Sequence, residues 1–140
     1  MWKGIDVSDN QGAINWAQIH KNVDFAILRS VRRSGKADHQ FAANLEGCRK
    51  RNIPMSVYKY TYAATPEAAR QEAQQVVVLL QSYGLTGTMV WWDVEDKDVL
   101  RPLGAAKLTE CIRAAQEVIT AAGYSFGLYV GLYVYNECWF

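Results

Sequence analysis

Short apolar runs alternate with longer segments of helical periodicity along the whole chain. Runs rich in β-branched and aromatic residues predict five strands, at 4–7, 24–30, 53–60, 88–94 and 125–130. Strands that alternate with helices are typical of a parallel sheet covered by helices, and right-handed crossovers bring the C-terminal ends of all its strands to one side. We therefore expect an α/β fold whose functional site lies at that edge.

Two of the helical segments carry start or stop signals. For the helix between 65 and 84, Thr65 suits the N-cap, Pro66 suits the first position, and Gly84 suits the residue after the last turn. The second helix is expected to end before Gly123, and its apolar residues share one face: Leu108, Cys111, Ile112, Ala115, Ile119 and Ala122. Such one-sided faces predict helices that pack against the sheet.

The number of predicted strands is small for a closed α/β barrel. An eight-stranded barrel typically takes about 250 residues and seldom fewer than about 200, whereas this chain has 140. The sequence also stops at YNECWF, soon after the fifth predicted strand. Two alternatives follow: an open sheet, or a barrel that lacks its last part. In either case we expect residues 1–140 to form one domain of about five strand–helix units.

Composition argues against several classes of partner. The net charge is +1 and the isoelectric point about 7.7, so no charge excess would draw the chain to nucleic acid or anionic lipid. No apolar stretch reaches the ~18 residues of a membrane span. The N-terminal MWKGIDVSD lacks the apolar core of a secretory signal. We therefore expect a soluble protein that stays cytoplasmic until release, or one whose leader has been removed.

The other reactive side chains offer little chemistry. Cys48, Cys111 and Cys138 are far apart and odd in number, so we expect small buried apolar residues rather than metal ligands or disulfides. His20 and His39 lie in helical or loop segments, away from any Ser or Cys at a strand end. No GxGxxG or GxxxxGK[ST] motif supports nucleotide binding. The sequence predicts no cofactor.

Carboxylates gather where the fourth predicted strand ends, in TMVWWDVED at 88–96. Side chains alternate along a strand, so Trp91, Asp93 and Glu95 share the face opposite the apolar one. Asp6 holds a similar place near the end of the first strand, and parallel strands would bring it to the same side. Mutual repulsion of such carboxylates raises at least one pKa. A protonated acid beside an ionised one is what cleavage of a glycosidic bond requires.

Less specific interpretations remain open for these carboxylates. A DxE pair at a strand end can cap the next helix or face solvent, and hard cations such as Mg²⁺ or Ca²⁺ also take carboxylate oxygens. We expect the neighbouring Asp96 and Asp98 to be solvated loop residues.

Aromatic residues strengthen the interpretation as a sugar site. Tyr58 and Tyr60 share one face of the third strand and Tyr62 follows it; each offers a ring face and a hydroxyl to a sugar. The alternative is that these tyrosines only fill a barrel interior. Arg29 ends the second strand, where it would contact a substrate oxygen, tune the carboxylates or serve as an ordinary ion-pair partner.

Several segments together resemble a known family. They are GIDVSDNQGAINW (4–16), FAILRS (25–30), the spacing of Asp38, Phe41 and Asn44, YKYTYA (58–63) and VWWDVED (90–96). In this order they resemble the glycoside hydrolase family 25 lysozymes, the muramidases of phages and bacteria. The resemblance extends over essentially the whole chain and implies an irregular eight-stranded α/β barrel.

The resemblance also implies an activity and residue roles. The activity is hydrolysis of the β-1,4 bond between N-acetylmuramic acid and N-acetylglucosamine in cell-wall peptidoglycan. Glu95 would be the general acid. Asp93 would orient the substrate's acetamido group or stabilise positive charge, and Asp6 would hold the network and the substrate.

The C-terminal part departs from the family pattern. Later strands of the family, which bring one more acidic residue to the cleft, have no counterpart in these 140 residues. Open strand edges are a liability, so we expect self-association or a complementing fragment to complete the barrel. The alternative function is a non-catalytic glycan-binding or interaction module derived from a lysozyme.

Overall fold

A single parallel sheet forms the centre of the computed structural model, which describes residues 1–140. Its strands are β1 (Gly4–Val7), β2 (Phe25–Arg29), β3 (Met55–Tyr60), β4 (Met89–Val94) and β5 (Ser125–Val130). Their order in the sheet equals their order in the chain, and every neighbouring pair is parallel. The strands predicted from the sequence are thus confirmed to within two residues at each end, and within this chain the sheet is open.

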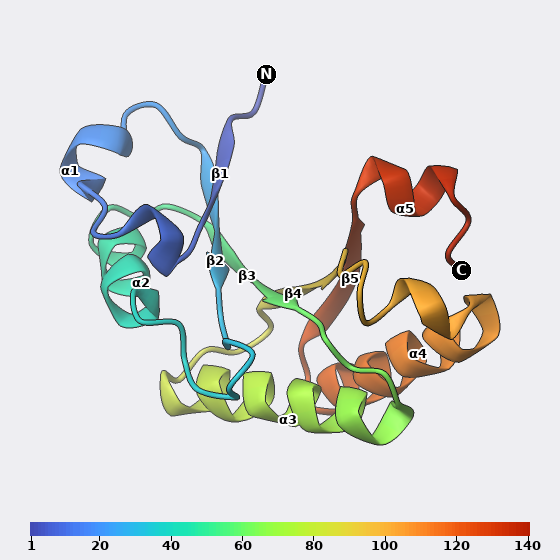
Figure 1. Ribbon diagram of the computed structural model, residues 1–140. Coiled ribbons are helices and arrows are strands. Elements are labelled where there is room, and N and C mark those ends of the chain that lie inside the picture. The colour runs from blue at the N-terminus through green and yellow to red at the C-terminus, as the bar shows by residue number, and fades with distance from the viewer.

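Helices connect the strands, and the longer ones cover one side of the sheet. They are α1 (Trp16–Ile19), α2 (Phe41–Lys50), α3 (Pro66–Ser82), α4 (Ala105–Ala121) and the short α5 (Leu132–Asn136), with 3₁₀ turns at Asp9–Gln11 and Arg101–Leu103. Figure 1 shows α2, α3 and α4 in a row along one side of the curved sheet, with α5 apart from them near the C-terminus. A functional site would therefore lie on the opposite side of the sheet, which these helices do not cover.

The predicted helix signals act as expected. The Thr65 side chain accepts a hydrogen bond from the amide of Ala68 at 3.1 Å, and Pro66 is the first residue of α3. Gly84 and Gly123 follow α3 and α4 with φ of +66° and +87°, a conformation that disfavours residues with a Cβ.

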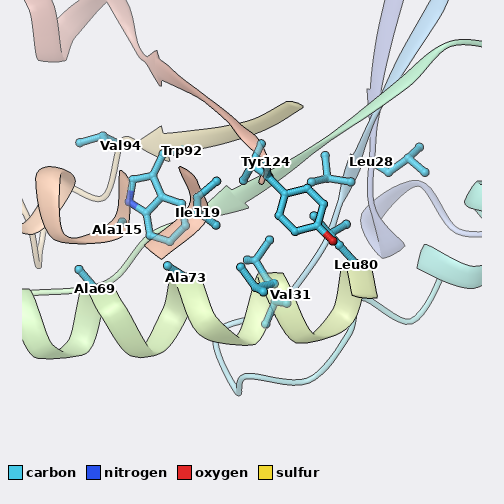
Figure 2. Packing of buried hydrophobic residues seen from close by; sticks show 14 of the residues in the cluster. Leu28, Val31, Ala69, Ala73, Leu80, Trp92, Val94, Ala115, Ile119 and Tyr124 are labelled. Carbon is cyan, nitrogen blue, oxygen red and sulfur yellow. The ribbon is translucent and has the colours of Figure 1, made fainter. Parts of the chain in front are cut away.

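The core lies between β4 and the two long helices. Trp92 and Val94 are buried on the face of β4 that meets α3 and α4. Figure 2 shows the indole of Trp92 above Ala73 of α3, with Ala69 further along that helix and Ile119 of α4 nearby. The alanines let the helix approach the sheet closely, and the indole of Trp92 fills the space at 1% exposure.

One cysteine contradicts its prediction. Cys48 and Cys111 are buried as expected, but Cys138 is exposed, because it lies in the turn after α5 at φ +52°, beyond the cover of the long helices. The predicted apolar face of α4 is also not buried throughout. Ile112, at the margin of that face, and Ala122, at the end of the helix, are only partly buried.

Two sheet edges stay unpaired, because β1 and β5 each have a single neighbour. Large apolar side chains are exposed near the second edge: Leu128, Tyr129, Leu132, Tyr135 and Phe140. The expected self-association stays a prediction. None of the helices combines the length and the apolar character needed to cross a membrane.

Candidate active site

A cavity of about 610 Å³ brings together all seven residues that the sequence singled out. They are Asp6, Arg29, Tyr58, Tyr60, Tyr62, Asp93 and Glu95. The same cavity is also lined by residues that were not predicted as site residues: Asn10, Phe25, Ile27, Trp91 and Tyr129. Strand alternation could have found Ile27 and Trp91, which share the faces of Arg29 and Asp93.

Sheet register places the central side chains in a row. Asp93 on β4 pairs with Tyr60 on β3 and with Tyr129 on β5. Paired residues point to the same face of a parallel sheet, so a carboxylate stands between two phenols. Tyr129 was missed because only the pairing of β4 with β5 brings it beside Asp93.

Asp93 is a buried carboxylate of the cavity. It is 8% exposed, and its buried Oδ1 has no hydrogen-bond partner. Burial, followed by the negative charges of Glu95 and Asp6, raises the pKa of Asp93 to about 7. Repulsion among the carboxylates therefore contributes as expected, but burial is the larger cause. Glu95 is half-buried and Asp6 is exposed.

The neighbouring loop acids behave differently from each other. Asp98 is exposed, as predicted. Asp96 is half-buried, and its carboxylate accepts a hydrogen bond from the amide of Val99 at 2.8 Å. It therefore fixes the turn after β4, and the prediction of a purely solvated residue is wrong for it.

No cluster of three or more His, Cys, Asp or Glu side chains is arranged to hold a metal ion.

Tyrosines form one wall of the cavity. The rings of Tyr60 and Tyr62 lie 5.0 Å apart, and the guanidinium of Arg33 lies 4.3 Å from the centre of the Tyr62 ring. Burial raises the pKa of Tyr58 to about 12 and that of Tyr60 further. Both hydroxyls keep their protons at neutral pH and can donate hydrogen bonds to a polar ligand.

Lys59 and Glu72 form an ionic network on the face of the sheet opposite this tyrosine wall. Glu72 of α3 accepts hydrogen bonds from the Thr61 hydroxyl at 2.6 Å and the Tyr62 amide at 3.0 Å. Lys59, which is 1% exposed, lies 3.8 Å from the Glu72 carboxylate and donates to the Tyr60 carbonyl at 2.9 Å. The backbone that carries two cavity tyrosines is thus held by an ion pair on the covered side of the sheet.

One of the roles left open for Arg29, that of an ion-pair partner, is confirmed. Its guanidinium lies 3.4 Å from Asp9 and 3.8 Å from the buried carboxylate of Asp38, so it is an ion-pair partner. It also lines the cavity, and its buried Nε has no hydrogen-bond partner. The hydrogen bond from His39, followed by the charge of Arg29, lowers the pKa of Asp9. A ligand at this end of the cavity would meet a fixed cation.

Comparison with known proteins identifies the family. The model of Glycosyl hydrolases family 25 matches residues 5–140. The chain belongs to this family. None of the curated proteins matches it.

Several solved structures share the fold of this chain. The modular autolysin LytC of Streptococcus pneumoniae is 29% identical with a TM-score of 0.85, over 96% of this chain and 33% of that one. The catalytic domain of endolysin Ply40 from Listeria monocytogenes bacteriophage P40 gives 23% and 0.81, over 98% and 67%. A bacterial lysozyme of Streptomyces coelicolor gives 21% and 0.80, over 98% and 66%. The chain thus spans one third of the autolysin and about two thirds of the others, whose likeness shows the shared fold.

Proposed function

We propose that this chain hydrolyses the β-1,4 bond between N-acetylmuramic acid and N-acetylglucosamine, and that it acts on peptidoglycan at the bacterial cell wall. The observation that carries the proposal is the buried, raised-pKa Asp93 beside Glu95 in a cavity walled by tyrosines. Binding a glycan needs no such pair, because repelling carboxylates cost free energy unless their protons are used.

Burial and the negative charge of Glu95 raise the pKa of Asp93 to about 7, so the site has a proton available near neutral pH. Glu95 is the more accessible member, so we assign it the general acid that protonates the leaving oxygen.

Asp93 and Asp6, which line the same cavity, would assist the general acid. The unpartnered Oδ1 of Asp93 suits acceptance of a hydrogen bond from the acetamido N–H, which would turn the acetamido oxygen toward the sugar's reacting carbon in a substrate-assisted step. Asp6, exposed at the end of β1, would hold substrate hydroxyls and add negative charge opposite the positive charge that develops.

Purified peptidoglycan tests the proposal directly. We expect the chain to release new reducing ends on muramic acid, identified after borohydride reduction, and Glu95→Gln to abolish them. Glu110→Gln, an exposed residue of α4, is the matched control and should act like the unchanged chain. Reducing ends on glucosamine would contradict the bond assignment. A folded chain that sediments with peptidoglycan without cleaving it would favour the alternative function, a glycan-binding module.

A further inference from the structure

The segment after β5 lies against Glu95 from outside the cavity. The Tyr133 hydroxyl donates a hydrogen bond to the backbone carbonyl of Glu95 at 2.7 Å. A Cβ placed on Gly131 would lie 2.8 Å from Glu95 Oε1 and 2.6 Å from the Tyr133 ring. Backbone and carboxylate of the same residue therefore each meet this segment.

Gly131 is present for space and not for backbone freedom. Its φ of −68° and ψ of 150° are extended values that any residue adopts. Alanine would fit the backbone, yet its methyl group would overlap the position of the Glu95 carboxylate. A side chain at this position would therefore require the Glu95 carboxylate and the Tyr133 ring to shift.

Tyr133 is itself fixed on two sides. The ammonium of Lys97 lies 4.3 Å from the centre of its ring, and the buried Trp139 packs against it edge-on at 5.7 Å. Trp139 in turn donates to the Glu137 carboxylate at 2.9 Å. A phenol held in this way can act as a rigid support for the backbone at Glu95.

We propose that Gly131 and Tyr133 are positioning residues that hold the Glu95 carboxylate toward Asp93 in the reactive geometry. The inference rests on the proposed function, in which Glu95 acts as general acid beside Asp93. Neither residue lines the cavity, so both act through Glu95 and not on the substrate.

Two variants displace Glu95 by different means. Gly131→Ala places a methyl group against its carboxylate, and Tyr133→Phe removes the hydrogen bond to its carbonyl. Because misplacing a reacting group by about 1 Å can cost about 100-fold, we expect kcat on soluble glycan chains to fall about 10- to 100-fold. KM should change less than about 2-fold, since the tyrosine wall is untouched.

Tyr124→Phe is the matched control. The Tyr124 hydroxyl also donates to a backbone carbonyl at 2.7 Å, that of Leu85, and it does not line the cavity. Its removal should lower stability to a similar extent and leave kcat unchanged. An equal loss of kcat in the control would assign the effect to general destabilisation and overturn the proposal.

A titration independent of turnover keeps the two proposals apart. Carboxyl carbon NMR of Asp93, whose pKa is raised in part by the charge of Glu95, should show an altered apparent pKa in Gly131→Ala and Tyr133→Phe but not in Tyr124→Phe. Unaltered titration in both variants overturns the positioning role. If the unchanged chain releases no reducing ends, the proposed function fails, while the titration still decides whether Gly131 and Tyr133 set the carboxyl pair.

Discussion

Replacing Asp93 by asparagine should stabilise the protein while removing its chemistry. The buried carboxyl has a folded-state pKa of about 7 against an ordinary value of 3.8. The folded state therefore holds the proton that the unfolded chain releases, and stability is lost as the pH rises from about 4 to about 7. Asparagine has nearly the same shape and no charge, so it avoids this loss.

The magnitude follows from the difference between the two pKa values. About three pK units correspond to a ceiling of about 4 kcal/mol, of which about 2.5 kcal/mol develops between pH 5 and pH 8. Asp93 is almost fully buried, so little of this is screened by solvent. The stability advantage of Asp93→Asn over the unchanged chain should therefore grow by about 2.5 kcal/mol over this interval.

Urea unfolding at pH 5, 6, 7 and 8 measures the difference, with activity recorded on the same samples. Asp98→Asn is the control, because Asp98 is exposed in the following loop, and its curve should run parallel to that of the unchanged chain. An advantage that stays constant with pH, or that shrinks as the pH rises, would refute the argument that a buried acid is held protonated at the cost of stability.

Two further variants test the support of the fold. Glu72→Ala should lower the unfolding free energy in urea by about 3 kcal/mol, because it leaves buried donors unpaired. The control Glu67→Ala changes an exposed residue of the same helix and should cost under about 0.5 kcal/mol. Equal losses in the two variants would contradict the role of the Glu72 network. Gly47→Ala should lower the melting temperature, although alanine has the better helix propensity, because its Cβ would overlap the Trp16 ring that packs against α2. A rise in the melting temperature would contradict this and show that Trp16 moves aside freely.

Features that depend on local pattern were predictable from the sequence. Alternation along β4 separated Asp93 and Glu95 from the apolar face that meets the helices, and parallel strands brought Asp6 to the same cavity. The start of α3 followed from Thr65 and Pro66, whose effects act within one turn. These signals need no knowledge of distant contacts.

Features that depend on pairing between elements were not predictable. Tyr129 reaches the cavity only through its register with Asp93. Lys59 and Glu72 lie on different elements, and only the packing of α3 on β3 makes their burial tolerable. The support of Glu95 by Tyr133 joins residues 38 positions apart. Each of these is a tertiary contact without a periodic signature.

The order of the sheet has a consequence for how the protein is made. Each strand pairs with the one synthesised just before it, from Gly4 with Phe25 to Met89 with Ser125. Pairing can therefore proceed from the N-terminus as the chain leaves the ribosome, with no strand waiting for a distant partner. Asp6 and Arg29 would be in place before Asp93 and Glu95 are added, and the contact of Gly131 with Glu95 would form only after β5 has paired. During synthesis the cavity residues of β1 to β3 would thus be in place before Asp93 and Glu95.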